Sequence, residues 1–344
     1  MAHPETIVVI GAGVIGLSTA LRIQQQLSPS QSVLLVAREF PSNESINYAS
    51  PWAGAHYRPV PGSSPQVLRE ANQAERTYKY LKRVAADEPG AGIKFLKGIE
   101  HLEAPPAEYS DPQSLRNVYA SMDDFRHLTK DELPVGVKWG VEYETWVINS
   151  PVYCAHILRK LILKGGRTKQ YTLANVKEAF SLAQNVRTVV NCSGLGFDDP
   201  ESFIIRVRNP VSATITRQNT DGSWSFCIPR PLDGGTIIGG TKQPHEWDPK
   251  PSPEIRARLL ANASKWFPFI PEGGGQFDVI RDIVGRRPAR QGGVRMEVEK
   301  LADGKNIVHA YGAGGRGFEI SWGVAEDTTG LMLENGLLQA RAAL

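Results

Sequence analysis

The sequence feature that most constrains the fold is a glycine-rich segment close to the N-terminus. Residues 6–20 read TIVVIGAGVIGLSTA, in which an apolar run leads directly into Gly11, Gly13 and Gly16. A helical pattern of apolar residues follows the glycines, and a second apolar run occupies residues 33–36. Strand, glycine turn, helix and strand within about 30 residues form the context in which GxGxxG spacing indicates dinucleotide binding. The sequence therefore predicts a doubly wound α/β domain of Rossmann type.

The residues of this motif have separate physical roles. Gly11 allows a tight turn, Gly13 lets a pyrophosphate approach the backbone, and Gly16 lets the helix pack on the strand. The first helical residues, Val14 and Ile15, offer free N–H groups and partial positive charge to phosphates. We expect these five residues to bind a dinucleotide. The alternative is a glycine turn that only packs a βαβ unit.

The acidic residue that usually completes the motif is displaced. It is expected about 20 positions beyond the glycines, where it would bind the ribose hydroxyls. The sequence at that distance is Ala37-Arg38-Glu39. Arg38 is a candidate to cover the adenosine phosphates or ribose, and Glu39 is a candidate for the displaced acid. This departure weakens a nicotinamide interpretation more than a flavin interpretation.

Composition excludes several classes of protein. The chain has 344 residues, which suits one large or two medium domains of roughly 100–200 residues each. Its net charge is only +3, without a block of like charges, so we expect neither nucleic acid nor a membrane as a partner. Three widely spaced cysteines form no disulfide framework or zinc pattern, and no metal site is expected. The chain shows no secretory signal and no apolar run of the ~18 residues that a membrane span needs.

Later segments predict that the cofactor domain is discontinuous. Residues 187–196 read as a short buried strand that ends in a glycine-rich turn, and residues 307–311 read as another strand before a second such turn. Alternating segments at 206–217 and 223–242 predict further β-strands, with a turn at residues 232–234. We therefore expect a doubly wound domain of residues 1–57, 141–196 and 280–344, and a strand-rich second domain of residues 58–140 and 197–279.

Seven stretches of the chain occur in the order of one known family. They are VVIGAGVIGLS near the start, YASPWAGA at 48–55, VVNCSGLG at 189–196, IPRP at 228–231, GGT at 239–241, VGRRPARQGGVR at 284–295 and HAYGAGGRGFEISWGVAED at 309–327. Together they resemble the D-amino-acid oxidase family of flavoproteins, and within it the D-aspartate oxidases of fungal type. The resemblance implies a doubly wound FAD domain and an antiparallel, strand-rich substrate domain, which agrees with the organisation described above.

The resemblance also implies that FAD binds noncovalently. It assigns flavin contacts to the YASPWAGA stretch and the residues around it, namely Ser45, Ala53, Gly54 and Ala55. Ser193 corresponds to a further FAD contact. A turn near the C-terminus corresponds to the family's turn whose N–H groups face the pyrimidine edge of the flavin. Its residues are Gly314, Gly317, Phe318 and Glu319, and we expect a helix to begin there. Partial positive charge at such a terminus would stabilise the reduced flavin.

The substrate site is implied by the same resemblance. Arg287 corresponds to the residue that binds the substrate α-carboxylate, for which a planar guanidinium is well suited because it pairs bidentately and stays charged. The carbonyl of Gly315 corresponds to the acceptor for the substrate amine. The alternative for Arg287 is an ordinary salt bridge.

Two positions depart from family members that oxidise neutral substrates. Phe226 stands where many members have a tyrosine that helps to hold the α-carboxylate. Lys242 follows GGT, where neutral-substrate members of fungal type tend to carry tyrosine and D-aspartate oxidases carry arginine. A cation in an apolar pocket needs an anionic partner, and the distal carboxylate of an acidic substrate would supply it. The alternative is that Lys242 extends into solvent. His56, Arg58 and Arg217 are further candidates to line this side of the substrate.

The implied reaction is oxidation of acidic D-amino acids, mainly D-aspartate and also D-glutamate, to the 2-oxo acid, ammonia and H₂O₂. FAD carries the redox chemistry, so we expect no catalytic acid or base from the protein. The partners are then a small D-amino acid and O₂. Three alternatives stay open: an oxidase of neutral D-amino acids, an NAD(P)-dependent dehydrogenase, and a binding module without turnover. Residence in the peroxisome is expected from the resemblance alone, because the Ala-Ala-Leu tail is only a distant variant of Ser-Lys-Leu.

Overall fold

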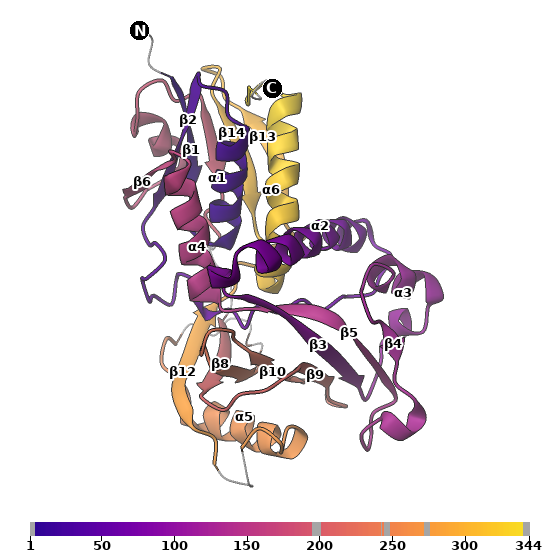
Figure 1. Ribbon diagram of the computed structural model, residues 1–344. Coiled ribbons are helices and arrows are strands. Elements are labelled where there is room, and N and C mark those ends of the chain that lie inside the picture. The colour runs from indigo at the N-terminus through magenta and orange to yellow at the C-terminus, as the bar shows by residue number, and fades with distance from the viewer. Residues whose placement is uncertain (1–3, 195–200, 242, 244–247, 272–275, 340–344) are drawn as a thin grey trace. The chain divides into compact units, whose positions relative to one another are not determined.

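The computed structural model describes residues 4–194, 201–241, 243, 248–271 and 276–339, and the chain divides into two compact units (Figure 1). Unit 1 contains Met1–Pro51, Pro151–Asp199 and Arg287–Leu344, and unit 2 contains Trp52–Ser150 and Pro200–Arg286. Each unit is built on its own β-sheet. The predicted α/β class with two sheets is therefore confirmed.

The sheet of unit 1 has six strands in the order β13-β14-β7-β1-β2-β6. All neighbouring pairs are parallel except β13 with β14, which is antiparallel. The interior strands β1 and β7 are buried along nearly their whole length, as is typical of parallel strands that are covered on both faces. The strands are β1 (Glu5–Ile10), β2 (Gln31–Ala37), β6 (Arg167–Gln170), β7 (Thr188–Asn191), β13 (Arg295–Lys300) and β14 (Asn306–Tyr311).

Helices cover one face of this sheet. Helix α1 (Val14–Gln26) packs on β1 and β2, α6 (Gly317–Glu334) packs on β13 and β14, and the two helices contact each other. Side chains at Val8, Ile10 and Val189 point to the opposite face, where the segment containing η5 (Val176–Ser181) covers them. Helix α4 (Ser150–Leu163) leads from unit 2 back into unit 1.

The sheet of unit 2 has eight strands in the order β12-β8-β11-β10-β9-β3-β5-β4. Its pairs are antiparallel except β3 with β9, which is parallel. The strands are β3 (Ile93–Leu102), β4 (Arg126–His127), β5 (Trp139–Ile148), β8 (Glu201–Val207), β9 (Thr214–Gln218), β10 (Trp224–Pro229), β11 (Thr236–Gly239) and β12 (Val279–Arg286).

Within the described residues, the boundaries between the units differ from the expected ones at three places. Residues 52–57, 141–150 and 280–286 were expected in the cofactor domain, and they lie in unit 2. The reason is strand pairing: β5 pairs along its whole length with β3, and β12 pairs with β8. Both strands therefore belong to the antiparallel sheet.

The two faces of the unit 2 sheet have different neighbours. Helix α5 (Pro253–Trp266) starts at a Ser252 cap, whose hydroxyl accepts the N–H of Ile255, and packs on the face that carries Ile205, Cys227 and Ile238. Because side chains alternate along a strand, the residues between these point to the other face. That second face carries a separate apolar cluster of Leu96, Val147, Ile204, Phe226, Ile228, Ile237 and Ile283, together with Trp52. The remaining helices of this unit are α2 (Pro65–Asp87) and α3 (Pro112–Tyr119).

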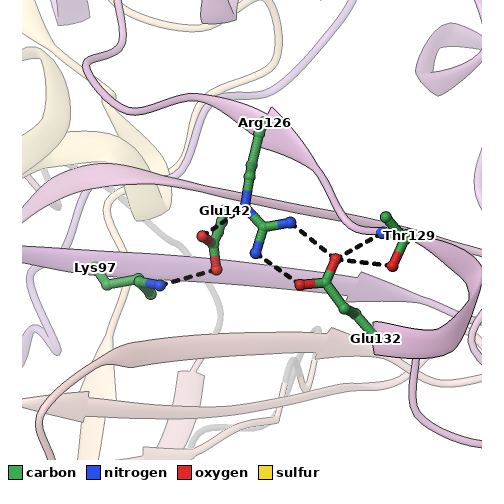
Figure 2. A network of polar contacts seen from close by, with 5 residues as sticks. All are labelled: Lys97, Arg126, Thr129, Glu132 and Glu142. Carbon is green, nitrogen blue, oxygen red and sulfur yellow. Dashed lines mark hydrogen bonds and ion pairs between the residues drawn. The ribbon is translucent and has the colours of Figure 1, made fainter.

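An ion-pair network closes one end of this sheet, and Figure 2 shows its five residues. Arg126 donates two 2.8 Å bonds to the carboxylate of Glu132 and a third, also 2.8 Å, to Glu142. Glu142 accepts from Lys97 at 3.0 Å. Glu132 also accepts from the backbone N–H and hydroxyl of Thr129, which caps the short helix η4 (Lys130–Glu132). The network ties β3, β4 and β5 to this turn.

The described ranges lack the features that a disulfide, a metal site or a membrane-spanning helix would require. Cys154, Cys192 and Cys227 are all buried free thiols. Among the described residues, no cluster of His, Cys, Asp or Glu has the arrangement of a metal site. None of the helices in the same ranges combines the length and the apolar character that crossing a bilayer requires.

Candidate active site

The glycine turn after β1 lies at the carboxyl edge of the unit 1 sheet. Gly11 has a φ of +96°, and a Cβ there would lie 2.4 Å from the carbonyl oxygen of Cys192. A Cβ at Gly16 would lie 1.9 Å from the carbonyl oxygen of Gly11. Both positions therefore require glycine, one for the turn and the other for close packing of helix on strand. The turn after β1 and the turn after β7 are in direct backbone contact.

Two residues that the sequence analysis did not assign hold this turn in place. The hydroxyl of buried Tyr48 donates a 2.6 Å bond to the carbonyl of Ala12. The hydroxyl of Ser50 accepts the N–H of Val14, the first residue of α1, at 2.9 Å. The sequence signal was present, because both residues belong to the YASPWAGA stretch, but only its last three residues had been given roles.

The N-terminus of α1 has the features of an anion site. Its cap residue is Gly13, which has no side chain to cap the helix, and its first turn, which includes Ile15, holds no acidic residue. The N–H of Val14, which was expected to be free, is bonded to Ser50. At the same edge, β2 ends at Ala37, and the exposed Arg38 forms a 3.4 Å ion pair with Glu39. Parallel strands bring these residues to the edge that carries the glycine turn.

The turns after β7 and β14 complete this edge. Ser193 follows β7, and its N–H donates to the side-chain oxygen of Asn191 at 3.2 Å. After β14, Gly314 begins the short helix η7 (Gly314–Arg316), and α6 then starts at Gly317 with buried Phe318 in its first turn. The side chain of Glu319 accepts a 2.7 Å bond from Arg316 at this terminus.

Arg287 and Gly315 lie side by side in unit 1. The carbonyl of Pro288 accepts the N–H of Gly314 at 2.9 Å, and Ala289 forms a bridge with Ala313. A Cβ on Gly315 would lie 3.8 Å from Cδ of Arg287. The structure therefore brings together the two residues that were assigned to the α-carboxylate and the amine.

Arg287 is a half-buried cation, and burial lowers its pKa below the ordinary arginine value. Among the residues that the structure describes, no carboxylate pairs with it. Its neighbour Arg290 instead donates to two carbonyl groups of its own loop, those of Gln291 and Gly293. Because a desolvated cation without a partner is unfavourable, Arg287 is prepared for an anion from outside the chain.

In unit 2, the segment of residues 53–55 is held by its backbone. The carbonyl of Ala53 accepts bonds from Ser150 at 2.7 Å and Arg230 at 2.6 Å. The carbonyl of Ala55 accepts the N–H of Ile148 at 2.8 Å. Gly54 packs on Ile228. Ser45, by contrast, lies in unit 1, where its hydroxyl accepts the N–H of Asn47 at 3.2 Å.

His56 and Arg58 lie on the unit 2 sheet face that carries Phe226. Nδ1 of His56 is 2.8 Å from the hydroxyl of Thr214. Burial, together with the charge of nearby Arg58, lowers the pKa of His56 to about 3, so His56 is neutral at pH 7. Arg58 is itself paired with buried Glu100 at 3.3 Å and stacks over the ring of Trp224.

Arg217 lies on the opposite face of the same sheet. Arg217 is two positions after Ile215 on β9, so both side chains point to the face that α5 covers. Its guanidinium lies 3.7 Å from the ring centroid of Trp266. It is 3% exposed and forms an ion pair with Glu103. The structure therefore does not bring Arg217 together with His56, Arg58 and Phe226.

Phe226 packs directly on β11. It pairs with Gly239, and a Cβ at Gly239 would lie 2.3 Å from its ring. Beyond β11, the N–H of Gly240 donates to the carbonyl of Trp224 at 3.2 Å. Lys242 lies outside the described residues.

The edge of unit 1 fits the diphosphate of a dinucleotide. The backbone at Gly11 and Gly13 is free of side chains, and the adjoining helix N-terminus carries partial positive charge without an acidic side chain to oppose it. A flavin dinucleotide suits this edge, because the second helix N-terminus at Gly317 is available to a ring system.

Comparisons with known proteins agree with this fit. The family described as FAD dependent oxidoreductase matches residues 6–331. The chain is 45% identical to a D-aspartate oxidase of Talaromyces thermophilus, over 96% of this chain and 95% of that one. It is 32% identical to a D-amino-acid oxidase of Schizosaccharomyces pombe, over 96% and 97% of the two chains.

A solved structure shares the fold. Glycine oxidase from Bacillus cereus superimposes with a TM-score of 0.73 at 17% identity, and the match covers 99% of this chain and 100% of that one. FAD is therefore the cofactor, and the nicotinamide alternative is not supported. The chain belongs to the D-amino-acid oxidase family of FAD-dependent oxidoreductases.

Proposed function

We propose that this protein oxidises acidic D-amino acids with FAD, D-aspartate above all and D-glutamate as well. The products are the 2-oxo acid, ammonia and H₂O₂. The observation that carries the proposal is Arg287, a half-buried guanidinium beside Gly315 without a carboxylate partner in the described part of the chain. An amino-acid substrate supplies the missing anion through its α-carboxylate.

The residues of the chain bind and orient the substrate. Arg287 pairs bidentately with the α-carboxylate and stays charged at any working pH. The carbonyl of Gly315 accepts a hydrogen bond from the α-amine. Two fixed contacts on one side of the α-carbon define its orientation, and such positioning removes most of the entropic part of the barrier. FAD held at the glycine turns of unit 1 would supply the redox chemistry, as hydride acceptor from the substrate and electron donor to O₂.

Preference for an acidic side chain is supported by three observations. A relative 45% identical to this chain is a D-aspartate oxidase. Phe226 lacks the tyrosine hydroxyl that neutral-substrate members use. Two alternative cations, Arg58 and Arg217, are already paired with glutamates. Lys242, which follows the strand that packs on Phe226, is then the residue that we propose pairs with the distal carboxylate.

Peroxide production across a panel of amino acids tests the proposal. We expect kcat/KM to rank D-aspartate and D-glutamate above D-asparagine and D-alanine. Comparison of D-aspartate with D-asparagine isolates the distal charge, because the two differ little in size. Equal values for this pair would refute the acidic preference and favour the neutral-substrate oxidase. L-aspartate is the stereochemical control and should give no peroxide.

Residence in the peroxisome stays a proposal from family resemblance. It agrees with the chemistry, because H₂O₂ is the expected product. Fluorescence microscopy of an N-terminally tagged protein tests it, and a diffuse cytosolic signal would count against it.

A further inference from the structure

Four groups of unit 1 form one continuous line of hydrogen bonds. The backbone N–H of Ser193 donates to the side-chain oxygen of Asn191 at 3.2 Å. The side-chain nitrogen of Asn191 lies 3.3 Å from Nδ1 of His309, and Nε2 of His309 lies 3.0 Å from the carboxylate of Glu299. The line runs from a carboxylate that is 44% exposed, through a histidine that is 5% exposed, to the turn after β7.

Donors and acceptors along this line are consistent with only one form of His309. The amide oxygen of Asn191 is used by Ser193, so its NH₂ group faces the histidine and must donate to Nδ1. Nδ1 is therefore without a proton, and Nε2 carries the proton that it donates to Glu299. His309 is held as the neutral Nε2–H tautomer.

Protonation of His309 would break the line at its centre. Nδ1–H and the NH₂ group of Asn191 would then be two donors facing each other. The amide relieves this by rotating to present its oxygen to His309, and the N–H of Ser193 loses its acceptor. The backbone of the same turn contacts Gly11, since a Cβ there would lie 2.4 Å from the carbonyl of Cys192. A change at Ser193 therefore reaches the glycine turn.

We infer that His309 is a positioning residue for the FAD-binding turns, and that FAD binding is coupled to its neutral tautomer through Asn191. This inference rests on the proposed FAD contact of Ser193. FAD should bind more weakly once His309 is protonated. Loss of one such partly buried hydrogen bond corresponds to about five- to tenfold in the dissociation constant.

Burial favours the neutral form of His309 against the carboxylates near it. Glu299 and Glu297 on β13 favour protonation, whereas Arg295 on the same strand opposes it. Tyr311 on β14 contacts the imidazole ring with its own ring. His309 points to the same face of the sheet as Val189, and η5 covers that face. This segment carries Lys177 and Glu178, and Glu178 is bonded to Tyr171. Burial outweighs the two glutamates and lowers the pKa of His309 below 6.5.

The matched variants are chosen to separate the tautomer from the fold. His309→Asn keeps an acceptor oxygen near the place of Nδ1 and cannot titrate. Asn191→Asp offers an acceptor to both Ser193 and Nδ1, so it should raise the pKa of His309 and remove the penalty of its protonation. The control is His127→Asn, the same change at an exposed histidine of unit 2.

The experiment measures how much FAD the holoenzyme retains, from the fluorescence of released flavin on dilution at about pH 8 and about pH 5. We expect the parent and His127→Asn to lose affinity about five- to tenfold more between these values than His309→Asn and Asn191→Asp. Long-range ¹⁵N NMR of the imidazole is recorded in parallel. It should show Nδ1 without a proton in the parent at neutral pH. In Asn191→Asp the ring should become doubly protonated at a higher pH than in the parent.

Two results would overturn the inference, and they differ from failure of the proposed function. A proton on Nδ1 of the parent at neutral pH would contradict the hydrogen-bond line itself. Identical FAD retention in all four proteins at a pH where NMR shows His309 of the parent to be doubly protonated would contradict the coupling to FAD. Peroxide formation from D-aspartate is measured separately on the same samples. The proposed oxidase activity can be present whichever of these two results is obtained.

Discussion

Replacing Arg287 by leucine should weaken substrate binding without lowering the stability of the fold. Removal of one partner from a buried, hydrogen-bonded charge pair costs about 3–5 kcal/mol. At about 1.4 kcal/mol per factor of ten, kcat/KM for D-aspartate should fall by roughly 10²–10⁴-fold. FAD should stay bound, because the glycine turns of unit 1 do not depend on the guanidinium.

The same change should leave stability unchanged or raise it. No carboxylate within the described residues loses a partner, and burial already lowers the pKa of Arg287, which means that the folded state disfavours its charge. Arg217→Leu is the matched contrast. Arg217 is 3% exposed and paired with Glu103, whose side chain is 11% exposed, so that variant leaves a carboxylate without its cation. We expect it to be destabilised by about 3 kcal/mol.

The assay combines kcat/KM for D-aspartate with urea unfolding of both holoenzymes. Arg290→Leu serves as a second control, because Arg290 bonds only to carbonyls of its own loop in the described structure, and its activity should change by only a few-fold. The reasoning is refuted if Arg287→Leu keeps the parent kcat/KM. It is also refuted if Arg287→Leu loses as much stability as Arg217→Leu, since a structural ion pair would then exist at Arg287.

Three further predictions follow from the site and from the surface network. Lys242→Tyr should lower kcat/KM for D-aspartate by roughly 10–1000-fold, about 1.4–4 kcal/mol, and that for D-alanine much less; an equal change for both substrates would show that Lys242 does not read the side chain. Acid precipitation should release all yellow colour, because no residue is expected to attach FAD covalently, and colour retained in the pellet would contradict this. The bonds from Arg126 lower the pKa of Glu132 to about 2, below its ordinary value of 4.5. The network's contribution is then complete above about pH 4.5 and is lost as the pH falls toward 2. Glu132→Gln should therefore flatten the dependence of urea midpoint on pH in this window, and an unchanged slope would argue against the network in Figure 2.

Local patterns in the sequence were sufficient for the cofactor half of the site. The strand, glycines and helix at residues 7–26 are adjacent in the chain, so their spacing alone predicts the turn that Gly11 and Gly16 form. Alternating runs likewise predicted the strands of the second domain. Strand partners were harder to predict, because a run of alternating residues does not reveal which sheet it joins. For that reason β5 and β12 were expected in the wrong unit.

The state of each arginine could be decided only by the tertiary structure. Arg58, Arg217 and Arg287 are equivalent cations in the sequence, and each was a candidate to bind a carboxylate. The partner of Arg217 is 114 positions away on the chain, and that of Arg58 is 42 away. Strand pairing brings Glu103 and Glu100 to those two arginines, whereas the described structure brings no carboxylate to Arg287. The sequence determines which residues carry charge, but long-range pairing determines which charge is left for a ligand, because a buried cation is neutralised by whatever the fold places beside it.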